Sequence, residues 1–170
     1  MINPELHIFL ADWARHWASL PAGSGPAARR AHFETVAAVM RQPMPDGVQT
    51  AEHWVADTID GDVRQVRLRS FRPAAGAGNA QPALIYLHGG AWMQGSPETH
   101  WDITAGIAAA TGRAVFSVDY AKAPEQPFPA AVHDAQAVVQ WLFGQAAALG
   151  VDAQRIAIGG DSAGANLAAA

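Results

Sequence analysis

The sequence predicts an α/β fold with a parallel sheet covered by helices on both faces. Short apolar runs typical of buried strands occupy 83–87, 114–118 and 155–158, and helical patterns at about 98–110 and 130–149 separate them. Strands that alternate with helices in this way form βαβ crossovers and a parallel sheet. The third run stops at two glycines followed by polar residues, and a wound sheet presents its reactive groups at the carboxyl ends of its strands.

The first 47 residues predict two helices and a linker ahead of this sheet. Apolar residues at alternating spacings of four and three define one face of a helix over 4–20, with Asn3 as its N-cap and a proline in its first turn. That face comprises Leu6, Leu10, Trp13, Trp17 and Leu20. A second helix over about 27–41 follows a Gly/Pro loop, and the composition of 42–47 is that of a linker.

Two alternating runs, 53–59 and 63–71, predict a β-hairpin between the helices and the parallel strands. Asp60-Gly61 lies between them, and Asp-Gly flanked by alternating apolar residues favours a tight hairpin turn. The Ala-, Gly- and Asn-rich stretch over 73–82 is expected to be a surface loop.

Composition and charge exclude several classes of function. The 170 residues carry a net charge of −4 without a run of Lys or Arg, so a nucleic-acid partner is not indicated. The absence of cysteine excludes disulfides and thiol chemistry. No stretch approaches the ~20 apolar residues of a membrane span, and no secretory signal is visible, so we expect a cytoplasmic protein. No feature of the sequence predicts an oligomeric state.

The turn after the last predicted strand carries the residues with the clearest chemical meaning. Gly160-Asp161-Ser162-Ala163-Gly164 lies between an apolar strand and an alanine-rich helix, the context of a G-x-S-x-G nucleophile elbow. A turn tight enough to raise Ser162 above the sheet brings strand and helix together, so its neighbours must be small. The helix also directs free backbone N–H groups at the serine. An ordinary Gly/Ser turn is the alternative for this motif alone.

A glycine-rich loop after an earlier strand is the second feature. The strand over 83–87 ends in His88-Gly89-Gly90-Ala91-Trp92. Hydrolases with this elbow need backbone donors for the tetrahedral oxyanion, one from the residue after the nucleophile, here Ala163, and others from such a loop. The loop alone is compatible with an ordinary turn, but together with Ser162 it indicates an oxyanion hole.

Three blocks together resemble the hormone-sensitive-lipase-like group of α/β-hydrolases, the bacterial esterases of lipase family IV. The loop over 88–92 is similar to the family's H-G-G-G-[FW] motif, and 160–166 is similar to its G-D-S-A-G-x-N elbow. Residues 120–131 resemble its Y-R-L-A-P-E-x-P-F-P-A-A block. The resemblance implies that residues 48–170 form the first half of an α/β-hydrolase domain, with its first five strands and the start of the nucleophile helix. It also implies that the helices over residues 1–47 form part of a cap.

The resemblance also implies the chemistry. Ser162 would attack the carbonyl of a short-to-medium acyl ester and form an acyl-enzyme. The oxyanion hole would consist of His88, Gly89, Gly90, Ala91 and Ala163, with the N–H groups of the last three as donors. The partner is a small-molecule ester, and neither a cofactor nor a metal is needed.

The sequence departs from the family pattern at a few positions. Ala91 replaces the third glycine and adds a methyl group near the acyl site. Ala121 and Lys122 replace Arg and Leu, which removes the arginine through which a polar network could run. Trp13 and Trp17 either roof the pocket or simply pack between helices.

The acid and base of a catalytic triad are missing from their expected places. In this fold an Asp or Glu and then a His follow the serine, whereas the eight residues after Ser162 contain no titratable side chain. All seven histidines precede it, at positions 7, 16, 32, 53, 88, 100 and 133. Residues 168–170 stop within a helix without a C-cap signal, and the strand over 155–158 would form an unpaired apolar edge. We therefore expect the inactive N-terminal half of an esterase about twice as long.

Two alternatives remain open. A related arylformamidase branch also has an H-G-G-x-W loop and a G-x-S-A-G elbow, although the block over 124–129 favours the esterase branch. The other is a non-catalytic remnant, a binding protein on a hydrolase scaffold. An in-frame continuation after codon 170 that encodes a later Asp and His would favour a truncated esterase, whereas a natural stop would favour the remnant.

Overall fold

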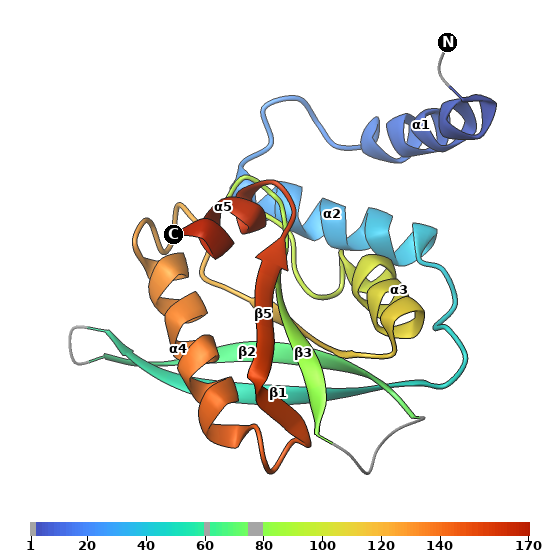
Figure 1. The fold of residues 1–170 in the computed structure, drawn as a ribbon. Helices are drawn as coiled ribbons and strands as arrows, with labels where there is room; N and C mark the ends of the chain where they lie inside the picture. Colours follow the sequence, from blue (N-terminus) through green and yellow to red (C-terminus); the bar gives the residue numbers. More distant parts are fainter. Residues whose placement is uncertain (1–2, 60–61, 75–79) are drawn as a thin grey trace.

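The computed structural model describes residues 3–59, 62–74 and 80–170, with helices on both faces of a five-stranded sheet (Figure 1). The helices and strands, in chain order, are α1 (Pro4–Trp17), α2 (Pro26–Met40), β1 (Val48–Ile59), β2 (Asp62–Pro73), β3 (Gln81–Leu87), α3 (Trp101–Thr111), β4 (Ala114–Asp119), α4 (Ala130–Gln145), β5 (Val151–Gly160) and α5 (Ala163–Ala169).

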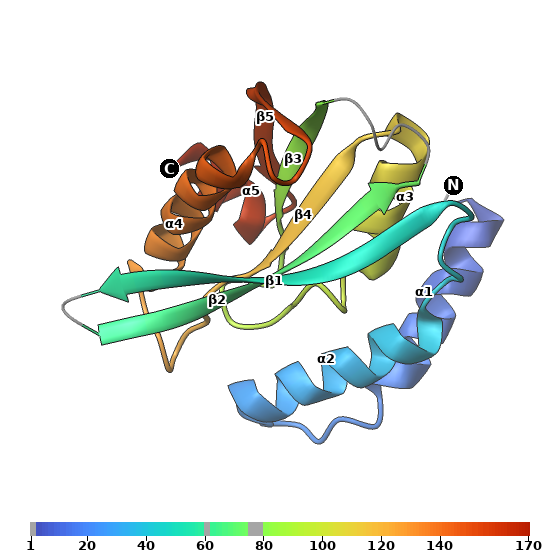
Figure 2. The same cartoon turned by 90° about the horizontal axis from the view of Figure 1, so that it is seen from below.

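The strand order is β1-β2-β4-β3-β5, with β3 parallel to both β4 and β5 and the β1–β2 hairpin antiparallel. The chain moves outward from β3 to β4 and then back across β3 to β5. Because such crossovers are right-handed, their helices lie on opposite faces, α3 on one and α4 on the other (Figure 2). The direction of winding changes at β3, and a wound sheet opens a crevice at the carboxyl ends of its strands where this change occurs.

The predicted strands and helices are confirmed, with changed ends. The strand predicted over 155–158 extends to 151–160, and among the described strands it pairs with β3 alone. It lies at the edge of the sheet, where Ile158 is 39% exposed, as expected for a strand with an unpaired side. The proposed hairpin turn at Asp60-Gly61 and most of the loop over 73–82 lie outside the described residues.

The core follows the two-residue period of the strands. On β3, Ile85 and Leu87 face α4 and α5, whereas Tyr86 faces α3. The core on the side of Ile85 and Leu87 includes Leu142 of α4 and Leu167 of α5. Both faces of β3 are thus buried, which fixes the position of the loop that leaves its carboxyl end.

The N-terminal helices are arranged differently from the helices of the sheet. Asn3 caps α1 as predicted, since its Oδ1 accepts the Glu5 N–H at 2.9 Å. Trp13 and Trp17 each pack on Phe33 of α2 with ring centroids 5.9 Å apart. The first turns of α1 extend beyond α2 (Figure 1), and Leu6 and Leu10 of its predicted apolar face are 46% and 42% exposed. Among the described helices, none has the length and apolarity needed to cross a membrane.

Gly106, in the middle of α3, provides a test of how this helix packs on the sheet. A Cβ added at Gly106 would meet no other atom within 4 Å, so alanine adds helix propensity without a clash. We expect Gly106→Ala to raise the free energy of unfolding by about 0.5–1 kcal/mol, measured by urea denaturation. A lower value than wild type would mean that α3 packs more tightly on the sheet than described.

Candidate active site

Ser162 occupies a sharp turn between β5 and α5. Its backbone has φ 49° and ψ −117°, in a left-handed region that is uncommon for a residue with a side chain, and the residue is exposed. A Cβ at Gly160 or at Gly164 would overlap the carbonyl oxygen of Leu87. The small residues that the sequence places around Ser162 are therefore required by the close passage of the backbone at the end of β3.

The Asp161 side chain connects this turn to the loop after β3. Its Oδ1 accepts the Gly89 N–H at 2.8 Å and the Tyr86 hydroxyl at 2.9 Å, and His100 Nε2 lies 3.5 Å away. Burial and then the bond to Asp161 raise the pKa of Tyr86 well above its usual value. Sequence reasoning assigned no role to Asp161, Tyr86 or His100, although Asp161 is a fixed position of the motif it quoted.

The bond to Asp161 changes which backbone groups are available to a ligand. The Gly89 N–H is occupied, whereas those of Gly90, Ala91 and Ala163 donate to no protein acceptor among the described residues. Ala91 has φ 52°, the left-handed conformation that the family's glycine would adopt without strain. The loop therefore keeps a glycine-like backbone although its third glycine is replaced.

His88 supports the glycine-rich loop from the core of the molecule. It is fully buried, its Nδ1 lies 2.8 Å from the Gly89 carbonyl oxygen, and its ring stacks on Tyr120 at 4.2 Å. The Tyr120 hydroxyl donates to the His88 carbonyl oxygen at 2.6 Å. Burial, with a smaller contribution from Lys122, lowers the pKa of His88 to about 3, so that its imidazole is neutral at physiological pH.

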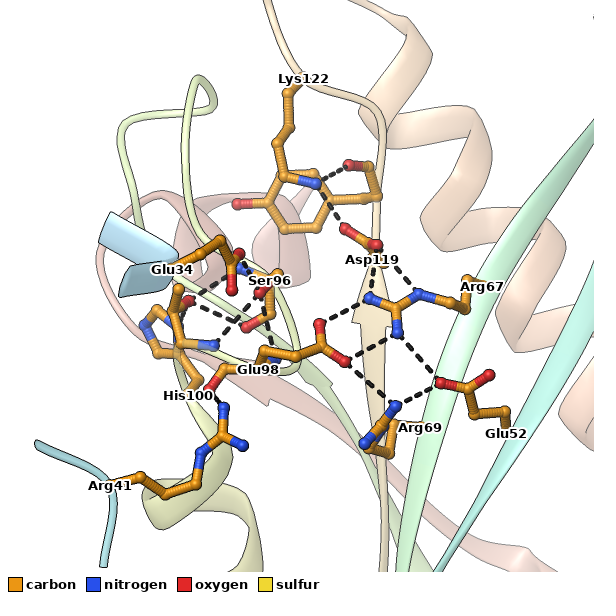
Figure 3. Close-up of polar contacts among 12 residues, drawn as sticks. Glu34, Arg41, Glu52, Arg67, Arg69, Ser96, Glu98, His100, Asp119 and Lys122 are labelled. Carbon is orange, nitrogen blue, oxygen red and sulfur yellow. Dashed lines mark hydrogen bonds and ion pairs between the residues drawn. The ribbon is translucent and has the colours of Figure 1, made fainter. Parts of the chain in front are cut away.

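A charged network anchors the far side of the same loop (Figure 3). The Arg67 guanidinium on β2 donates to Glu98 at 2.6 and 2.8 Å and to Asp119, at the end of β4, at 2.9 and 3.2 Å. Lys122 Nζ donates to Asp119 at 2.5 Å. Burial alone would raise the pKa of Asp119, but Lys122 and Arg67 outweigh it and lower the pKa. Lys122, which replaces the family's leucine, is thus part of a network built on Arg67, whereas the backbone N–H of Ala121, which replaces the arginine, donates to Asp134 at 2.6 Å.

An apolar pocket of about 470 Å³ opens beside the two turns. Its walls come from the loop after β3, from the segment after β4 and from α5. They include Ala91, Trp92, Met93, Ala123, Phe128 and Leu167. Trp13 and Trp17 are not among its lining residues, so the described structure shows them packing between helices.

No described histidine is hydrogen-bonded to the Ser162 hydroxyl. His88 is directed into the core, and His100 lies beside Asp161. His133 is on α4. Within the described part of the chain, no three His, Asp or Glu side chains are grouped so that they could hold a metal ion.

Comparisons with known proteins identify the family of the chain. Residues 84–170 match the model of the alpha/beta hydrolase fold, and the chain belongs to that family. It is similar to carboxylesterase NlhH of Mycobacterium tuberculosis, 44% identical over 88 residues that cover 52% of this chain and 28% of that protein. It is also similar to ethyl acetate hydrolase of Pseudomonas putida, 44% identical over 112 residues that cover 65% of this chain and 35% of that protein.

A solved esterase from the bacterial hormone-sensitive lipase family has a TM-score of 0.76 and 33% identity, with 99% of this chain and 50% of that chain covered. The resemblance predicted from the three motifs is therefore confirmed. The chain spans about half the length of this solved esterase and about a third of the length of the two curated relatives.

Asp161→Ala tests the connection between the two turns. The change leaves the Gly89 N–H and the Tyr86 hydroxyl without their acceptor, so we expect the free energy of unfolding to fall by about 1–3 kcal/mol. The pKa of Tyr86, followed by ultraviolet absorbance, should also fall. The matched control is Asp152→Ala, which removes a partly exposed carboxylate that pairs with Arg155 and accepts the Gln154 N–H, and it should leave the pKa of Tyr86 unchanged. An unchanged Tyr86 pKa in Asp161→Ala would contradict the connection.

The buried His88 predicts a loss of stability in acid. Below a pH of about 6.5 the unfolded chain binds a proton at His88 that the folded chain excludes, so the free energy of unfolding falls as the pH decreases from there toward 3. His53 and His100, whose pKa values burial also lowers, act in the same direction. We expect His88→Asn to make this pH dependence shallower in urea denaturation at pH 7.5 and pH 5. An equal slope in both proteins would mean that His88 titrates normally.

Proposed function

We propose that this chain carries the nucleophile and the oxyanion hole of a serine carboxylesterase. The observation that supports it most strongly is the close contact between the Ser162 turn and the loop after β3. The Asp161–Gly89 hydrogen bond and the overlap that a Cβ at Gly164 would make with Leu87 both belong to this contact. It supports the proposal because the turn and the loop carry an exposed hydroxyl and N–H groups that donate to no acceptor in the described part of the chain.

In the proposed reaction, Ser162 Oγ forms a bond to the ester carbonyl carbon, and the proton of the hydroxyl passes to a histidine base. The carbonyl oxygen becomes an oxyanion that accepts hydrogen bonds from the N–H groups of Gly90, Ala91 and Ala163. Each such donor is worth about 3–4 kcal/mol in comparable sites. The alcohol leaves with a proton, and water then hydrolyses the acyl-enzyme. This sequence of steps uses no metal and no cofactor.

The base and its orienting carboxylate are absent from the described surroundings of Ser162. In the α/β-hydrolase order both follow the nucleophile along the chain. We therefore assign them to sequence beyond residue 170 in an active form of the protein. Residues 1–170 alone should show no appreciable turnover, because a serine without a base is a weak nucleophile.

The size and lining of the pocket support the assignment of an ester with a short-to-medium acyl group as substrate. Its volume of about 470 Å³ is within the range of small-molecule sites, and its lining is mainly apolar. A relative that is named for hydrolysis of ethyl acetate, itself a short acyl ester, agrees with this assignment.

Turnover of p-nitrophenyl butyrate tests the proposal in two forms of the protein. We expect residues 1–170 to be no faster than their Ser162→Ala variant. If the reading frame continues beyond codon 170, the longer product should be active, and Ser162→Ala should lower its kcat by about 10⁴-fold or more. Activity of the longer product that survives Ser162→Ala would contradict the serine mechanism. Turnover by residues 1–170 that Ser162→Ala abolishes would show that a base is already present.

A further inference from the structure

Polar side chains connect helix α2 to the segment that follows the glycine-rich loop, next to a ring contact between Phe33 and His100. Val36 is the one buried residue among its described positions. Four polar contacts join α2 and the residues just after it to the segment over 93–102. They are Arg30 Nε to the Met93 carbonyl oxygen at 2.7 Å, Ser96 Oγ to Glu34 at 2.5 Å, Arg41 to the Glu98 carbonyl oxygen at 3.0 Å, and the Gln42 N–H to Asp102 at 3.1 Å. This segment continues directly from the loop that carries Gly90 and Ala91.

Arg30 differs from the other contacts because it reaches two separate segments. Besides the Met93 carbonyl oxygen, it donates to the Ala123 carbonyl oxygen at 3.3 Å and pairs with Glu125. Met93 and Ala123 belong to two different segments of the chain, and both line the apolar pocket. The guanidinium therefore bridges two walls of the pocket from outside.

The two walls are also hydrogen-bonded to each other and to the loop beside Ser162. The Ala123 N–H donates to the Trp92 carbonyl oxygen at 2.9 Å. The N–H groups of Met93 and Gln94 donate to the Gly90 carbonyl oxygen at 3.1 and 3.0 Å. A displacement of Met93 would therefore be transmitted directly to Gly90.

We propose that Arg30 is a positioning residue through which α2 fixes the walls of the substrate pocket. It holds Met93 and Ala123 at a set separation and so determines how well longer alkyl groups fit. This inference rests on the proposed function only in assigning the pocket to the substrate. The ion pair with Glu125 is secondary, because that carboxylate is 54% exposed and exposed pairs contribute little. The planar fork of Arg, which Lys lacks, is what two carbonyl oxygens require.

Amide hydrogen exchange of residues 1–170 tests the bridge without any need for catalysis. Arg30→Met should accelerate exchange at the N–H groups of Met93, Gln94 and Ala123 about tenfold, the effect of losing a charge-assisted hydrogen bond. Arg30→Lys, which keeps the charge, should show most of the same acceleration. The controls are Arg29→Met, the neighbouring cation that lies over Trp17, and Glu125→Gln, which removes only the ion pair. Both controls should leave these three amides unchanged.

Binding of butyrate and octanoate, followed by NMR titration, tests the effect on the pocket. Arg30→Met should change the ratio of the two Kd values about fourfold, as expected when packing equivalent to one methylene is lost, and Glu125→Gln should not. Unchanged exchange in both Arg30 variants, uniform acceleration over the whole chain, or an equal effect of Glu125→Gln would overturn the inference. If neither carboxylate binds while exchange still responds to Arg30, the assignment of the pocket to the substrate fails and the bridge stands.

Discussion

The structure depends on one close backbone contact, where the chain leaves β3. The carbonyl oxygen of Leu87 occupies the space that side chains at Gly160 and Gly164 would need. A methyl group does not fit at either position, so both must be glycine. It brings the loop after β3 against the turn that holds Ser162, and every feature of the candidate site is built around it.

A loop of several residues with left-handed backbone angles needs further support to keep one conformation. Asp161 supplies it from the side of the elbow, His88 and Tyr120 from the core, and Arg67 through Glu98 from the sheet. His88 and Tyr120 are buried and Arg67 and Glu98 are partly buried, whereas the Asp161 side chain is 44% exposed. Where the anchors are buried, each hydrogen bond is strong and an unmade one is costly. The loop is therefore preorganised by protein groups before any ligand arrives, as oxyanion stabilisation requires.

The sequence was sufficient for the fold and for the two motifs, because both leave local signals. Apolar patterns predicted nine of the ten elements, and the G-x-S-x-G context with its alanine-rich continuation predicted α5. The glycine pattern indicated the tight turn that the angles of Ser162 show. Contacts between distant segments left no such signal. The bonds from Arg30 to Met93 and Ala123 span 63 and 93 residues of sequence, and both acceptors are main-chain carbonyl groups, which every residue possesses. The exposure of Leu6 and Leu10 on α1 was missed for a related reason, since periodicity predicts an apolar face but not what covers it.

The central claim is that two backbone turns converge on the hydroxyl of Ser162 to form a site for a negatively charged oxygen. A crystal structure of the protein after reaction with a p-nitrophenyl alkylphosphonate tests it most directly. We predict a phosphonyl group on Ser162 Oγ, with one oxygen about 2.7–3.1 Å from the backbone nitrogens of Gly90, Ala91 and Ala163. A phosphonyl group on another residue, or on Ser162 with its oxygens directed away from these three nitrogens, would contradict the account.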